Sequence, residues 1–122
     1  MDEPGLLTRL RVAIIRRRVA ARNRRAEADL KAVPGLWDEI MAYAKGSEVT
    51  GASMSDYWTL YDQVRTHRPR EILECGTGVS TVVLAHALKE NQAEGFPAGR
   101  VTSMEEDEDW HRTASERIPA HL

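Results

Sequence analysis

Two glycines that follow a short apolar run place the tightest constraint on how this chain can fold. The run, Glu-Ile-Leu-Glu-Cys at residues 71–75, leads directly into Gly76-Thr77-Gly78. Glycines here let the backbone turn sharply, and they let a ligand approach the main chain without meeting a Cβ atom. The pattern predicts a strand over residues 71–75, a turn over 76–79 and a helix over 80–91.

A second strand and helix are predicted further along the chain. A loop over residues 92–99, with two glycines and a proline, precedes a strand over residues 100–105 and a helix over 107–118. This alternation implies a right-handed crossover between two parallel strands, and hence an α/β fold. Ligands of such sheets bind beyond the carboxyl ends of the strands, where the next helix offers unbonded N–H groups.

The chain before residue 68 is predicted to be helical. Helices are expected over residues 6–31, 36–44 and 53–67, with a helix stop at Lys45-Gly46 and a loop over 46–52. The third helix carries an apolar stripe that we expect in the core: Met54, Tyr57, Trp58, Tyr61 and Val64. We divide the chain into residues 1–52, a helical segment for cover or oligomerisation, and residues 53–122, a partial cofactor-binding domain.

The first predicted helix is basic and has two apolar stripes. Residues 1–31 hold nine Lys or Arg against four Asp or Glu, a net charge of +5, and the rest holds eight against fifteen, −7. One stripe is Val12, Ile15, Val19, Ala26 and Leu30, and the other is Leu7, Leu10, Ile14 and Ala21. A helix on a membrane surface has a single broad apolar face. Two stripes favour a helix held by protein on two sides, or homo-oligomerisation. The positive charge is explained either by a basic face in contact with solvent or by an anionic partner.

Glu74 distinguishes between classes of ligand. A dinucleotide would place its pyrophosphate over the turn, and a carboxylate at the end of the strand would repel it. The third glycine of the dinucleotide fingerprint is also replaced, by Thr81. A ligand with a sulfonium and an ammonium group would be attracted instead. Glu105, at the end of the second predicted strand, can accept hydrogen bonds from both hydroxyls of a ribose, whereas residues 107–109 are explained as acidic residues at a helix N-terminus.

Residues 72–81, Ile-Leu-Glu-Cys-Gly-Thr-Gly-Val-Ser-Thr, resemble the first motif of class I S-adenosylmethionine-dependent methyltransferases, in the variant where Ser-Thr replaces the third glycine. Residues 101–105 resemble that family's second strand, and the resemblance covers about residues 53–118. It implies a Rossmann-like fold, with Glu74 near the methionine end of the cofactor, Glu105 at the ribose and Glu106 near the adenine. The implied cofactor-binding residues are Glu74, Cys75, Gly76, Thr77, Gly78, Ser80, Thr81, Glu105 and Glu106.

The chain departs from the family in length. Family members have a seven-stranded sheet, whereas only two strands are predicted here, and a two-stranded parallel sheet is a poor independent unit. We therefore expect an N-terminal fragment with an incomplete sheet, which by itself binds the cofactor weakly or not at all. The catalytic residues and the contacts to the unknown methyl acceptor would lie after residue 122.

The single cysteine and the four histidines are expected to have structural roles. Cys75 is the only cysteine, so no internal disulfide forms; we expect it to be buried, and a reducing, cytoplasmic location fits best. The four histidines, His67, His86, His111 and His121, lack metal-ligand spacing, so no metal site is expected. No apolar run is long enough to span a membrane.

Two further functions stay open. One is a nucleotide-dependent oxidoreductase that uses NAD or FAD at the same turn. The other is a non-catalytic interaction module in which the basic helix binds a membrane surface, a nucleic acid or a protein. The basic helix has no interleaved aromatic residues, so nucleic-acid binding is not expected.

Overall fold

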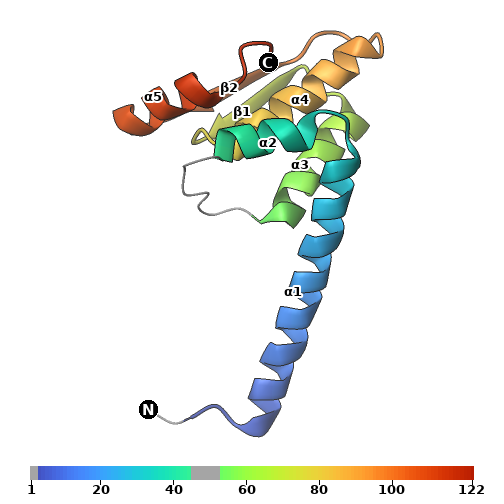
Figure 1. Ribbon diagram of the computed structural model, residues 1–122, viewed down its shortest axis with the longest axis vertical. Coiled ribbons are helices and arrows are strands. Elements are labelled where there is room, and N and C mark those ends of the chain that lie inside the picture. The colour runs from blue at the N-terminus through green and yellow to red at the C-terminus, as the bar shows by residue number, and fades with distance from the viewer. Residues whose placement is uncertain (1–2, 45–52) are drawn as a thin grey trace.

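The computed structural model describes residues 3–44 and 53–122 and combines several helices with one small sheet (Figure 1). Mixed α/β structure is thereby confirmed. None of the described helices is long and apolar enough to cross a membrane. The elements are, in chain order, α1 (Leu6–Ala32), α2 (Leu36–Ala44), α3 (Met54–His67), β1 (Glu71–Cys75), α4 (Val79–Ala93), β2 (Arg100–Met104) and α5 (Glu108–Arg117).

The predicted bounds hold along most of the chain. β1 spans the residues expected, and each helix begins and ends within about two residues of its prediction, the usual spread at helix ends. Ser53 caps α3 as expected, because its main-chain N–H donates to Asp56 Oδ2 at 3.0 Å. The predicted stop at Lys45-Gly46 and the predicted loop over 46–52 lie outside the described residues.

The second strand ends one residue earlier than predicted. β2 closes at Met104, whose carbonyl oxygen accepts a hydrogen bond from the Gly76 N–H at 2.7 Å. The prediction that Glu105 continues the strand is wrong. Its carboxylate instead accepts hydrogen bonds from the N–H groups of Thr77 and Asp107.

The two strands are parallel and are covered on one face. The register pairs Glu71 with Arg100 and Cys75 with Met104. Ile72 and Val101 pack against the helical core, whereas Leu73 is 67% exposed and Met104 is 53% exposed on the other face. Cys75 shares that uncovered face and is exposed, so the prediction of a buried cysteine is wrong. The reason is that alternate residues of a strand point to opposite faces.

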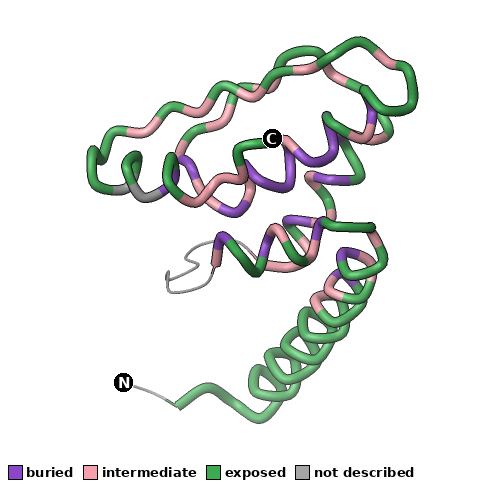
Figure 2. The backbone as a smooth tube through the Cα atoms, turned by 45° about the horizontal axis from the view of Figure 1, so that its top comes forward, coloured by how far each residue is buried: buried purple, intermediate pink, exposed green. Residues whose placement is uncertain are grey.

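α4 is the centre of the core and packs against α2, α3 and β2. Its Val82, Val83 and Ala87 are fully buried (Figure 2). The core also takes Leu30, Leu36 and Ile40 from before residue 52. The expected stripe on α3 is confirmed: Tyr57, Tyr61 and Val64 are buried, and Met54 and Trp58 pack against the core while partly exposed.

Most of α1 projects away from this core (Figures 1 and 2). Of its residues only Ala26 and Leu30 are buried, and every residue from Leu6 to Arg22 is exposed. At about 1.5 Å per residue the projecting part is roughly 25 Å long. The prediction of a helix held by protein on two sides is therefore not met within the described chain, because only the last turns of one stripe reach the core.

A run of polar contacts links the helices beside the core. His86 Nδ1 on α4 lies 2.8 Å from Glu39 Oε2 on α2, and His86 Nε2 lies 2.7 Å from Glu90 Oε1. The Tyr61 hydroxyl on α3 donates to Glu90 Oε2 at 2.8 Å. His121 Nε2, near the last described residue, lies 2.8 Å from Glu39 Oε1. Burial and the hydrogen bond to Glu90 raise the pKa of Tyr61 to about 12.

The two parts of α1 should respond differently to the same substitution. Leu30→Ala removes a fully buried side chain and should lower the free energy of unfolding by about 2–5 kcal/mol. Leu10→Ala, on the same helix but 51% exposed, should change it by no more than about 0.5 kcal/mol. Urea denaturation followed by circular dichroism measures both. Equal losses would contradict the packing described for α1.

Tyr61 should make stability fall at alkaline pH. Its neutral phenol is favoured in the folded chain, so its contribution is present below the ordinary pKa of 10.0 and is lost as pH rises toward about 12. Burial also raises the pKa values of Tyr43 and Tyr57, so Tyr61→Phe should flatten this fall without abolishing it. Urea midpoints across this pH range test the slope, and an unchanged slope in Tyr61→Phe would rule out the assignment.

Candidate functional site

The turn between β1 and α4 lies at the carboxyl ends of both strands. Gly76 has φ +87°, a left-handed conformation that favours glycine. Gly78 has φ −176° and is extended, so its conformation does not require glycine. A Cβ atom at Gly78 would meet nothing within 4 Å, so this position leaves the surface of the turn open. The Gly78 N–H donates to Thr81 Oγ1 at 3.1 Å and starts α4.

The Glu74 carboxylate joins three elements of the structure. It accepts hydrogen bonds from the hydroxyls of Ser80 and Thr81 on α4, the latter at 2.5 Å, and from Ser103 on β2 at 2.7 Å. Hydrogen bonds to a charged acceptor are the stronger kind. A carboxylate has about four acceptor positions, so three are occupied by the chain itself. Glu74 therefore holds the N-terminus of α4 against both strands.

Ser103 is a site residue that the sequence analysis did not identify. The register places it directly opposite Glu74 on the adjacent strand, and both side chains face the covered side of the sheet. The sequence did contain a signal. Ser103 lies two residues after Val101 and therefore on the same covered face of a short strand, where a polar side chain needs a hydrogen-bond partner. Only the strand register shows that the partner is Glu74.

Glu105 brings a second carboxylate to the turn. Its Oε2 accepts a hydrogen bond from the Thr77 N–H at 3.0 Å, and its Oε1 accepts one from the Asp107 N–H at 3.1 Å. Oε2 also lies 3.9 Å from the place where a Cβ atom of Gly76 would stand. The side chain is half-buried. Two acidic residues, one on β1 and one directly after β2, thus flank one glycine turn.

The predicted site residues are brought together except for two side chains. Contacts at the turn join the following residues: Glu74, Gly76, Thr77, Gly78, Ser80, Thr81 and Glu105. The Cys75 side chain lies on the uncovered face of the sheet, so only its main chain adjoins the turn. Glu106 is exposed.

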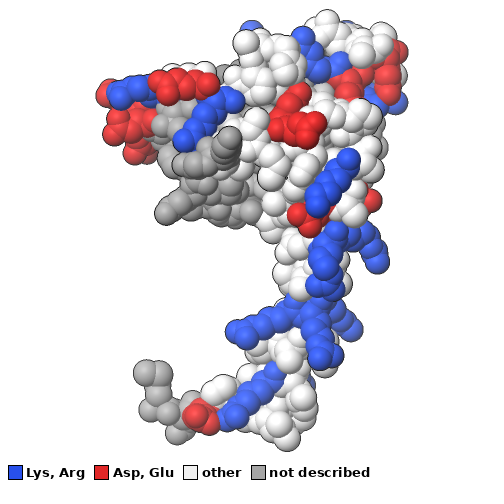
Figure 3. All heavy atoms as spheres, viewed as in Figure 1, with Lys and Arg blue, Asp and Glu red and all other residues white. Residues whose placement is uncertain are grey.

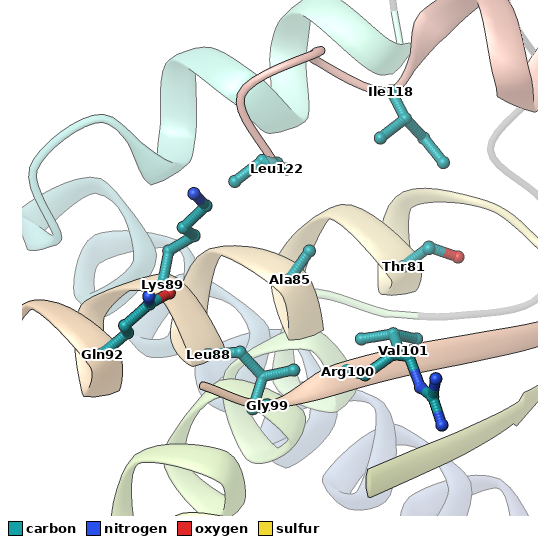
Figure 4. A pocket seen from close by; sticks show the side chains of 10 residues that line it. All are labelled: Thr81, Ala85, Leu88, Lys89, Gln92, Gly99, Arg100, Val101, Ile118 and Leu122. Carbon is teal, nitrogen blue, oxygen red and sulfur yellow. The ribbon is translucent and has the colours of Figure 1, made fainter. Parts of the chain in front are cut away.

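A cavity of about 290 Å³ lies between α4, the start of β2 and the C-terminal residues (Figure 4). Ile118 and Leu122 lie along one side of α4, and Leu88 and Val101 line the other side. At its floor Gly99 packs so closely that a Cβ atom would lie 2.5 Å from Leu88 Cδ2. The cavity extends from Gly99 and Arg100, at the amino end of β2, along α4 to Thr81, whose hydroxyl group also contacts Glu74 at the glycine turn.

Within residues 3–44 and 53–122, no three His, Cys, Asp or Glu side chains converge as they would around a metal ion. Comparison of the chain with protein-family models, with curated proteins and with solved structures found no significant match. The function of this chain is therefore inferred from the geometry of the turn.

Removing the Glu74 charge should destabilise the fold. Glu74→Gln replaces one acceptor oxygen with an NH₂ group, so at least one hydroxyl loses its partner, and the free energy of unfolding should fall by about 1–3 kcal/mol. Ser103→Ala should cost about 1 kcal/mol because it removes one of the three bonds. Urea denaturation measures both variants.

Glu71→Gln is the matched control for this pair. Glu71 is on the same strand, is exposed, and pairs with exposed Arg100 at 3.1 Å. Its loss should cost less than about 1 kcal/mol. If Glu74→Gln were no more destabilising than Glu71→Gln, the Glu74 carboxylate would not hold the three elements together.

Proposed function

We propose that this chain is the N-terminal, cofactor-binding part of an S-adenosylmethionine-dependent methyltransferase with a Rossmann-like sheet. The observation that carries the proposal is the position of Glu105, whose carboxylate reaches from the end of β2 onto the glycine turn at the end of β1. In open α/β sheets an acidic residue at this place receives the hydroxyls of a ribose. A cytoplasmic location belongs to the same proposal.

The charges of the site favour this cofactor over a dinucleotide. Glu74 on β1 and Glu105 just after β2 both contact the segment from residue 76 to 81. A pyrophosphate over this turn would meet two carboxylates and be repelled. The sulfonium and ammonium groups of S-adenosylmethionine would be attracted to them. The ribose of the same cofactor offers two hydroxyl donors, which match the two oxygens of Glu105.

Glu74 would act mainly by shaping the turn. Because Ser80, Thr81 and Ser103 already donate to its carboxylate, about one acceptor position remains for a ligand. Its negative charge stays one strand position away from the turn, where it favours a cationic ligand. The contact with the methionine end that the family resemblance implies would use that remaining position.

The bound cofactor would supply an electrophilic methyl group. The residues described above bind and orient it, and none of them is assigned acid–base chemistry. Acceleration of methyl transfer comes largely from alignment of the acceptor with the methyl group, so a rigid turn is the contribution expected from this part of the enzyme.

Calorimetric titration of the full-length protein with S-adenosylhomocysteine tests the proposal. We expect saturable binding that weakens about 10- to 100-fold in Glu105→Gln, because hydrogen bonds to a charged acceptor contribute about 1.5–3 kcal/mol. Glu116→Gln, an exposed carboxylate on α5, is the control and should bind as the parent does.

Two outcomes would overturn this assignment. The first is absence of binding heat, or an affinity that Glu105→Gln leaves unchanged. The second is tight NADH binding that Glu74→Gln does not affect, which would assign the turn to a nicotinamide cofactor.

A further inference from the structure

The two apolar stripes of α1 lie on opposite sides of the helix. Leu10 and Val12 belong to different stripes and are two residues apart, which is roughly 200° around an α-helix. We call Val12, Ile15, Val19, Ala26 and Leu30 the inner stripe, and Leu7, Leu10, Ile14 and Ala21 the outer stripe. Within each stripe, steps of seven residues keep the side chains on one side.

The inner stripe is the one that faces the core. Ala26 and Leu30 are buried, and nearby Asn23 accepts a hydrogen bond from the Ser55 N–H at 3.2 Å. Since α3 packs on this side and the two stripes are well over a quarter turn apart, the outer stripe points away from α3. Leu7 is 73% exposed, and Leu10 and Ile14 are each 51% exposed.

Arginines flank the outer stripe. Arg11, Arg17, Arg18 and Arg24 each lie three or four residues from one of its members and are exposed. The sequence has no Asp or Glu between Glu3 and Glu27, and none of these four arginines has an acidic partner within the described residues. Figure 3 shows several Lys and Arg side chains along the projecting helix. The face is thus apolar along its middle and cationic along its borders.

We propose that this outer face of α1 binds the surface of an anionic lipid bilayer. Leu and Ile side chains would enter the boundary of the acyl region while α1 lies in the plane of the surface. Arginine suits the borders, because its long stem lies along apolar surface while its planar guanidinium binds phosphate with two hydrogen bonds. The projecting part provides roughly 25 Å of helix for this contact. The body does not obstruct the contact, since it packs on the opposite stripe.

The structure thereby resolves the sequence-based objection to a membrane-surface helix. The body packs against only the end of the inner stripe, at Ala26 and Leu30, and the earlier members of that stripe stay exposed. Because α3 packs on that side of the helix, a flat surface can lie along the outer stripe without meeting the body. A second copy of α1 would bring two arginine-rich faces together, which is unfavourable. A nucleic acid would match the arginines but would leave Leu7, Leu10 and Ile14 against a polar groove.

Co-sedimentation with vesicles tests the proposal on the full-length protein. Binding should be at least about tenfold stronger to phosphatidylcholine vesicles that contain phosphatidylglycerol than to phosphatidylcholine alone, and it should weaken as salt is added. The double variant Leu10→Glu/Ile14→Glu should lose this binding. Val12→Glu/Ile15→Glu introduces the same charge on the inner stripe and should largely keep it.

The unfolding midpoint and the circular dichroism of both double variants should match those of the parent, because all four positions are exposed. Arg17→Gln/Arg18→Gln supplies a second measure: it should reduce the preference for phosphatidylglycerol without changing the fold.

Equal loss in the two double variants, or no preference for anionic vesicles, would overturn the proposal. A dimer in analytical ultracentrifugation that only the Leu10/Ile14 variant abolishes would assign the face to a second copy. Stronger binding to duplex RNA than to anionic vesicles at equal salt would assign it to nucleic acid. The titration with S-adenosylhomocysteine measures binding at the glycine turn and does not depend on α1. The proposal for the turn and the proposal for α1 can therefore be rejected independently.

Discussion

The Glu74 carboxylate determines how the glycine turn is held in this molecule. It lies at the end of β1 and receives hydroxyl groups from both β2 and the first turn of α4, so three elements meet at one charged group. The contact links the first turn of α4 to the register position at which Glu74 faces Ser103. Among the described residues, a second carboxylate that contacts the turn is that of Glu105, which directly follows β2. The geometry of the candidate site follows from these two acidic residues.

The helical core explains why so small a sheet is ordered. α4 presents Val82, Val83 and Ala87 to α2, α3 and β2 at once, and α1 contributes Leu30 to the same cluster. The covered face of the sheet is half of what a parallel sheet normally buries. Leu73 and Met104 on the other face remain exposed. Stability therefore rests mainly on helix packing, and the sheet chiefly positions the turn.

Much of the fold and the central part of the site could be predicted from the sequence. β1 and the helices were predictable because glycine, proline and apolar spacing are local signals. The proximity of Glu105 to the turn was also predictable, although β2 ends one residue before it. The exposure of Cys75 was not, because it depends on which face of the sheet is covered. The role of Ser103 needed the strand register, and the separation of the α1 stripes into an inner and an outer face needed the position of α3.

Glu105 also has a consequence for selectivity. Its two oxygens each accept one main-chain hydrogen bond, from Thr77 and Asp107, which fixes the carboxylate and leaves about two acceptor positions open. If the turn binds the cofactor proposed above, a sugar with two adjacent hydroxyls would fill both positions. A deoxy sugar would leave one of them unfilled, and a phosphorylated sugar would bring a like charge. Selection at this carboxylate would then depend on the number of donors that the ligand offers, without any steric barrier.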